Sequence, residues 1–127
     1  MKTKYVDGFV LVVHKKNVAA YRKMAQGAAK IWKKHGALDY KECIGDDLKP
    51  NTMGYKIFYF PQMTKLKKGE TVWFSFVTFK SKKHRDQVNA RVMKDPSMQP
   101  SDSNHMDKMP FDMKRMAYGG FKVMVDA

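Results

Sequence analysis

One stretch, residues 70–96, constrains the fold more than any other, because it joins a strand that is apolar on both faces to a basic helix. Residues 71–79 are almost all β-branched or aromatic, which is typical of a strand, and both alternating faces are apolar. A strand of this kind needs cover on both sides. Ser81 can then cap a helix that ends at Asp95, because Pro96 disfavours helical geometry in the residue before it.

The other periodic segments predict three further strands, at residues 5–13, 37–44 and 113–125, and one further helix, at residues 17–36, which the Asn17 side chain can cap. The order strand, helix, strand, strand, helix, strand predicts an α+β domain of the ferredoxin-like βαββαβ type. Such a domain has an antiparallel sheet with both helices on one face. The chain of 127 residues has the size of one domain, so we expect residues 1–127 to form a single unit.

A single sheet with helices on one face leaves its other face bare. The strand segments 10–13 and 72–79 are apolar on both sides, and the chain has no residues left to cover the second side. We therefore expect a homodimer, in which another copy covers the bare face. The irregular segment 48–69 holds an aromatic cluster that we expect over a pocket mouth or at a partner surface, and residues 95–112 read as a long loop.

A series of short motifs runs along the chain: YVDGF at 5–9, HGAL at 35–38, GDD at 45–47, ETV at 70–72, FS at 74–75, SK at 81–82, RD at 85–86, Asn89, DP at 95–96, and MPFD and KRM-YGGF between 109 and 121. This pattern resembles the YbaA-like family of small bacterial proteins, a domain of unknown function, over nearly the whole chain. The resemblance implies a dimeric α+β barrel, in which two ferredoxin-like sheets face each other with the helices outside. It implies no established reaction or ligand.

Composition bounds the partners and the compartment. The 25 Lys and Arg against 12 Asp and Glu leave a net charge of +13, which either attracts polyanions or keeps a solvated surface. Cys43 is the only cysteine, so no intrachain disulfide can form and a reducing cytosol is the simplest compartment. No apolar run reaches the length of a membrane span. We expect a cytoplasmic protein without a membrane partner.

Arg85, Asp86 and Asn89 form the first polar candidate group. Positions 85 and 89 are one helical turn apart and share a face, so they can present a guanidinium and an amide to a carboxylate or carbonyl ligand, with Asp86 orienting a partner. The alternative is a structural ion-pair network that docks the helix or pins residues 109–112.

His35 and Asp7 are further catalytic candidates, because both are costly to bury without a partner and together they can perform acid–base chemistry near neutral pH. The alternative is a hydrogen-bonded histidine at a helix end and an acid bonded to backbone or to Arg115. Trp73 and Tyr118 can stack on a flat ligand, although aromatic residues of strands usually belong to the core.

Lysines can form a rim at one end of the predicted fold, because the first helix and the third strand end there. The members are Lys30, Lys33, Lys34, Lys80, Lys82 and Lys83. Such a rim would bind nucleic-acid phosphates without sequence specificity. The soft ligands Met98, His105, Met106 and Met109 match no recognised metal pattern, and no cofactor motif is present, so we expect neither a metal nor a cofactor.

Three functions remain open. The first is a dimeric protein that binds or transforms a small organic ligand in a pocket between sheet and helices. That pocket would be bordered by Asp7, His35, Trp73, Arg85, Asn89 and Tyr118. The second is a nucleic-acid-associated module that uses the lysine rim. The third is a structural dimer without a ligand.

Overall fold

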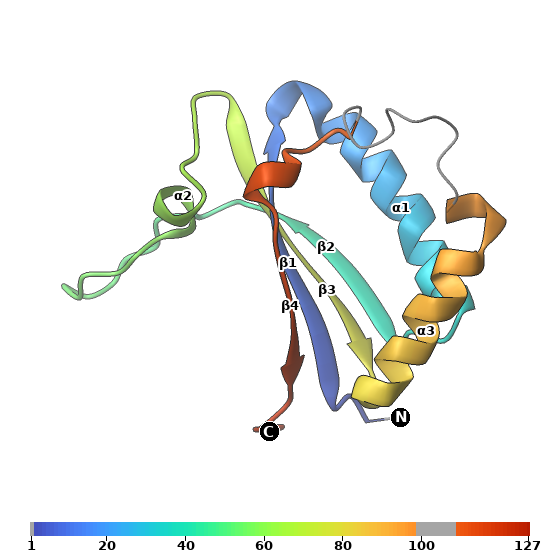
Figure 1. The fold of residues 1–127 in the computed structure, drawn as a ribbon. Coiled ribbons are helices and arrows are strands. Elements are labelled where there is room, and N and C mark those ends of the chain that lie inside the picture. Colours follow the sequence, from blue (N-terminus) through green and yellow to red (C-terminus); the bar gives the residue numbers. More distant parts are fainter. Residues whose placement is uncertain (1, 99–108) are drawn as a thin grey trace.

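The computed structural model describes residues 2–98 and 109–127. Its strands are β1 (Tyr5–His14), β2 (Asp39–Ile44), β3 (Glu70–Phe79) and β4 (Ala117–Lys122); its helices are α1 (Val18–Lys34), α2 (Phe60–Met63) and α3 (Lys82–Lys94); and short 3₁₀ turns lie at Lys15–Asn17, Pro96–Met98 and Met113–Arg115. The predicted α+β class with the βαββαβ order of its main elements is confirmed (Figure 1). Among the described residues, no helix has the length and apolar character needed to cross a bilayer.

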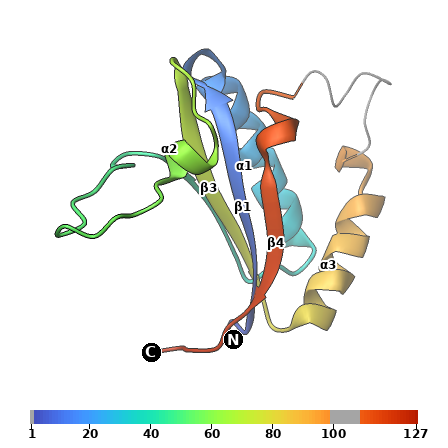
Figure 2. The same ribbon diagram turned by 60° about the vertical axis from the view of Figure 1, so that its left-hand side comes forward.

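The sheet is antiparallel throughout, with the strand order β2-β3-β1-β4. The strand that is apolar on both faces, β3, therefore lies inside the sheet beside β1. Helices α1 and α3 lie on one face, while α2 and the loop that leads to it extend on the other side (Figure 2). Successive side chains of a strand point to opposite faces of the sheet, so one set of side chains contacts the helices and the other set does not.

Three local predictions need correction. The side chain of Asn17 makes no capping hydrogen bond to α1, whereas Ser81 caps α3 as expected by accepting from the His84 amide at 3.0 Å. The last strand is shorter than predicted, because Asp112 caps a 3₁₀ turn by accepting from the Lys114 amide. The chain enters β4 only after that turn. The segment 45–69, for which no element was predicted, contains the single helical turn α2.

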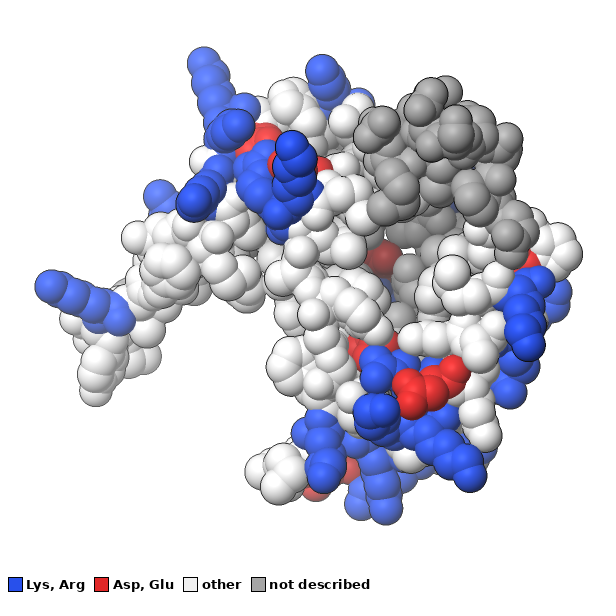
Figure 3. All heavy atoms as spheres, in the orientation of Figure 1, with Lys and Arg blue, Asp and Glu red and all other residues white. Residues whose placement is uncertain are grey.

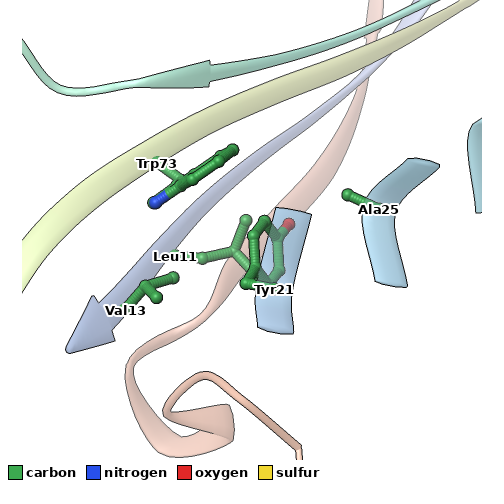
Figure 4. Packing of buried hydrophobic residues seen from close by; sticks show 5 residues of the cluster. All are labelled: Leu11, Val13, Tyr21, Ala25 and Trp73. Carbon is green, nitrogen blue, oxygen red and sulfur yellow. The ribbon is translucent and has the colours of Figure 1, made fainter. Parts of the chain in front are cut away.

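The core lies between the helices and the sheet, in two clusters. One joins the start of α1 to the sheet through Leu11, Val13, Tyr21, Ala25 and Trp73, with the ring of Tyr21 edge-on to Trp73 at 4.8 Å between centroids (Figure 4). The other packs Val88 and Val92 of α3 against strand residues that include Phe79. Burial of these side chains supplies most of the stability, at about 25 cal/mol for each Å² of apolar surface removed from water.

The helix-free face of the sheet exposes large apolar side chains. Phe74 of β3 and Phe121 of β4 are 44% and 63% exposed, and the Phe121 ring lies over Gly8, 3.4 Å from where a Cβ would stand. The loop between β2 and α2 forms an arm that projects from the body (Figures 1 and 2), and it exposes Tyr55 and Phe58. Exposed apolar patches of this kind usually mark an interaction surface.

Candidate functional site

A hollow of about 680 Å³ lies between the sheet and the helices. Most of its wall is apolar, and the side chains come from β1, α1, β2, β3 and the segments on either side of the undescribed residues 99–108. The larger members are Phe9, Leu11, Met24, Ile31, Trp32, Val77, Met98, Met109, Phe111 and Met116. Figure 3 shows the molecule hollowed between these elements, with an acidic side chain visible at depth. The volume is within the range of sites that bind small organic molecules.

Among the described residues, Glu42 is the one acidic residue in the wall of this hollow. It lies on β2 opposite Ser75 of β3, and strand alternation directs it to the helix side together with Tyr40. The Tyr21 hydroxyl donates to Oε1 at 2.8 Å and the Tyr40 hydroxyl donates to Oε2 at 2.8 Å. Burial raises the pKa of Glu42, and the hydrogen bonds from Tyr40, Tyr21 and Ser75 act against that rise. Burial and the neighbouring carboxylate likewise raise the pKa of both tyrosines.

A second hollow, of about 420 Å³, adjoins the first at the β2 edge and shares Ala25, Tyr40 and Glu42 with it. Trp73 lines this second hollow and not the larger one. Its buried Nε1 has no hydrogen-bond partner among the described residues. The carboxylate of Glu42 therefore lies at the meeting point of two hollows.

Three predicted site residues, Asp7, Arg85 and Tyr118, meet in one cluster although they are far apart in the sequence. Arg85 Nη1 donates to Asp7 Oδ1 at 2.7 Å and to the Tyr118 hydroxyl at 3.1 Å, and that hydroxyl donates to Asp7 Oδ2 at 3.2 Å. Arg85 Nε also donates to Asp86 Oδ1 at 2.8 Å, and Asp86 itself is exposed. Burial raises the pKa of Asp7, and the Arg85 guanidinium opposes this rise. The ionic partner of Asp7 is thus Arg85 and not Arg115.

Asn89 links this cluster to the larger hollow. Its Oδ1 accepts from Trp32 Nε1 at 3.1 Å, and Trp32 is part of the wall. Asn89 also hydrogen-bonds Asp7 and lowers the pKa of that carboxyl. Asn89 therefore positions a wall residue without lining the hollow itself.

His35 contacts Asp95 and not Asp7, so the proposed acid–base pair of His35 and Asp7 is not assembled. His35 Nε2 lies 2.8 Å from Asp95 Oδ2, and Lys34 reaches the same oxygen at 3.4 Å. Asp95 is only 5% exposed, and its hydrogen bonds to His35 and to Ser97 lower its pKa. This contact ties the end of α1 to the end of α3.

A further ion pair fastens the segment before β4 to the sheet. Arg115 binds both carboxylate oxygens of Glu70, one of them at 2.9 Å, and its Nε donates to Asp112 at 2.7 Å. Arg115 also donates to the Lys65 carbonyl at 3.1 Å. The bond from Arg115 is the main cause that lowers the pKa of Glu70 to about 2.

Within the described part of the chain, two of the six lysines of the rim pair with an acid. Lys34 pairs with Asp95, Lys82 pairs with Asp86 at 3.1 Å, and Lys33 donates to the Leu38 carbonyl at 2.7 Å. The lower part of Figure 3 is mostly blue, with a patch of red side chains within it. Two of the four soft ligands that the sequence offers for a metal, His105 and Met106, lie outside the described residues.

None of the six residues expected to border the pocket lines the larger hollow. Sequence reasoning missed Glu42, Tyr21 and Tyr40, although one signal was available. Tyr40 and Glu42 alternate on a short strand, and a carboxylate on the inward face of a strand is costly unless hydrogen-bond donors face it.

The architecture defines a class, the ferredoxin-like α+β domains. A crystal structure from Bacillus cereus, of a protein proposed in its name to be an antibiotic biosynthesis monooxygenase, covers 99% of this chain and 98% of its own with a TM-score of 0.56. Its sequence identity of 8% makes this a likeness of fold alone.

The sequence family is narrower. A family model described as "Protein of unknown function (DUF1428)" matches residues 4–113, and the chain belongs to that family. It is also similar to the uncharacterised protein YbaA of Escherichia coli strain K12 and of Shigella flexneri. Each of these is 41% identical over 123 residues, which are 97% of this chain and 98% of the relative.

Proposed function

We propose that this protein binds a small organic ligand in the larger hollow between its sheet and its helices. The observation that carries the proposal is a half-buried carboxylate, Glu42, held by two tyrosine hydroxyls inside a mostly apolar wall. A cavity with few polar groups in fixed positions is the usual form of a ligand site, since apolar walls supply affinity and polar groups supply orientation. The fold likeness to the Bacillus cereus protein is compatible with this function and adds no substrate.

The two tryptophans give a direct test, because Trp32 lines the larger hollow and Trp73 does not. In a Trp73→Phe background, Trp32 is the only tryptophan. N-phenyl-1-naphthylamine, an apolar dye that is neutral near pH 7, is expected to quench Trp32 emission as it fills the hollow. Unchanged emission over the whole titration would contradict the proposal.

A substitution that fills the hollow, compared with one at an exposed position of the same helix, provides a matched pair of variants. Ala28 lines the larger hollow on α1, whereas Ala19 is exposed on the same helix and outside the wall. Ala28→Phe is expected to weaken dye binding about tenfold or more, since it occupies the ligand's volume. Ala19→Phe is expected to leave binding unchanged. Equal weakening by both substitutions would point to a general effect on the fold.

We also propose that the protein is a homodimer formed through the helix-free face. Phe74 and Phe121 are exposed there, and the same chain carries the exposed apolar arm between β2 and α2. Phe121→Glu should yield a monomer in sedimentation at micromolar concentration, because a charge would be buried in the interface. Lys122→Glu, on the other face of β4, is the control and should remain dimeric. A monomeric wild-type protein would contradict the proposal.

A further inference from the structure

The charge balance around Glu42, which is half-buried, differs from that of the other buried and half-buried acids. Among the described residues, Asp7, Glu70 and Asp95 each form an ion pair with an arginine, lysine or histidine. Glu42 forms none, and no cation contributes to lowering its pKa. Its hydrogen-bond donors within the described part of the chain are the neutral hydroxyls of two tyrosines and Ser75. The carboxylate is therefore hydrogen-bonded but lacks a counter-charge, in a chain whose net charge is +13.

A carboxylate can accept about four hydrogen bonds, so three hydroxyl donors leave acceptor capacity toward the hollows. Arg22 borders the smaller hollow and Lys23 the larger one, but both are exposed residues of α1 and neither pairs with Glu42 within the described chain. A cation that enters the hollow would gain the attraction of a carboxylate in a region of low dielectric constant. An anion would meet the same carboxylate as a like charge.

The rest of the wall suits the body of an organic cation. Trp32 and Tyr40 offer aromatic faces that attract cations, and Phe111 adds apolar surface. Met24 and Met116 are flexible and polarisable, so they adapt to ligands of differing shape. The repulsion from the lysines outside is screened beyond about 10 Å at 0.1 M salt, whereas the contact with Glu42 inside the hollow is not.

We infer that the ligand is an apolar organic cation, a protonated amine on a hydrophobic body, whose N–H group pairs with the Glu42 carboxylate. This inference rests on the proposed ligand-binding function and adds the chemical class of the ligand. The tyrosine hydroxyls hold the carboxylate in place from one side, and the ammonium group approaches from the hollow. The hydrophobic body packs on the methionine and aromatic side chains.

The test compares three probes that share one body: 4-phenylbutylamine, 4-phenylbutan-1-ol and 4-phenylbutanoate. They are a cation, a neutral molecule and an anion at neutral pH. Isothermal titration of the wild-type protein is expected to give affinities that fall in that order, with the amine at least about tenfold tighter than the alcohol. An alcohol or acid that binds as tightly as the amine overturns the inference, and it leaves the proposed pocket function intact.

Glu42→Gln keeps the shape of the side chain and removes its charge. In this variant the amine should bind no more than about twofold tighter than the alcohol. Asp47→Asn removes an exposed acid outside both hollows and should retain the full preference for the amine. A preference that survives Glu42→Gln overturns the inference. If the dye binds and none of the three probes does, the inference fails alone; if the dye does not bind either, the proposed function fails with it.

Discussion

Glu42 and Glu70 are glutamates on neighbouring strands of one sheet, yet their surroundings are opposite. Glu70 is bound by the Arg115 guanidinium through both oxygens, and its pKa is lowered to about 2. Glu42 is bound by neutral hydroxyls, and burial raises its pKa. A carboxylate that is neutralised within the chain has a structural role, whereas one without a cation at the wall of a hollow remains open to a ligand.

Most of the short motifs along the sequence supply ion pairs with a structural role, like that of Glu70. The HGAL and DP segments meet in the pair of His35 with Asp95, and the ETV and KRM segments meet in the pair of Glu70 with Arg115. The YVDGF, RD and YGGF segments meet around Arg85. These clusters join distant segments of the chain, and none of their charged members lines the larger hollow. They hold in place the elements from which the hollow is built.

The largest effect is expected from Arg115→Met, which breaks the contact of Arg115 with Glu70 and Asp112. The side chains of Arg115 and Glu70 are only 19% and 12% exposed, so the substitution leaves a mostly buried carboxylate without its cation. We expect a loss of about 2 kcal/mol or more in the free energy of unfolding, measured by urea denaturation. Lys114→Met is the control at an exposed neighbouring position. Similar losses in the two variants would show that the ion pair contributes little.

The pH dependence should separate the two glutamates by sign. Glu70 has a pKa of about 2 in the folded state against an ordinary value of 4.5, so its contribution to stability is complete above pH 4.5 and is lost as the pH falls through about 2. The advantage of the wild type over Glu70→Gln should therefore shrink in that window. A constant difference in stability from pH 5 to pH 2 would contradict the assignment.

A smaller effect of the opposite sign is expected for Glu42→Gln. Because burial raises the pKa of Glu42, its ionisation costs stability as the pH rises above the ordinary value of 4.5. The variant should be as stable as the wild type at pH 4 and more stable at pH 8. Urea denaturation at the two pH values measures this change. A variant that is less stable than the wild type at pH 8 would mean that the ionised carboxylate stabilises the fold.

The smallest effect is expected from Lys82→Ala. Its pair with Asp86 joins two exposed side chains at successive turns of α3, so solvent weakens the attraction. The free energy of unfolding should change by less than about 0.5 kcal/mol.

Filter binding to a single-stranded RNA tests the lysine rim with the same variant, and only weak, strongly salt-dependent binding is expected. Tight binding of the RNA that is insensitive to salt would support a nucleic-acid-binding function.

The fold could be predicted because its signals are local. The two apolar faces of β3, the Ser81 cap and the β-branched and aromatic run of β1 predict the elements, and the order of the elements then predicts the topology. The long-range partners were harder to predict. Asp7 was expected to pair with His35 or, alternatively, to bind backbone or Arg115. Only the register of β1 with β4 and the position of α3 bring it to Arg85 and Tyr118.

The hollow itself had no local signal strong enough to reveal it. Glu42 can be recognised as a site residue only through its hydrogen bond from Tyr21, which is distant in the sequence. That contact depends on the packing of α1 over β2. Tyr21 is one of several large residues along the apolar stripe of α1, and its hydroxyl distinguishes it only when a carboxylate lies opposite. Such a pairing depends on tertiary structure and cannot be read from spacing.

The central claim is that Glu42 is a carboxylate available to a cationic ligand. A titration of the glutamate side-chain carbonyl carbons by NMR, with Glu42 and Glu70 assigned, tests it most directly. In the free protein the pKa of Glu42 should lie above 4.5 and that of Glu70 near 2. Saturation with 4-phenylbutylamine should lower the pKa of Glu42 and leave that of Glu70 unchanged, because a cation favours the ionised form of its partner. A pKa of Glu42 that starts at its ordinary value and does not move with the amine would contradict the account.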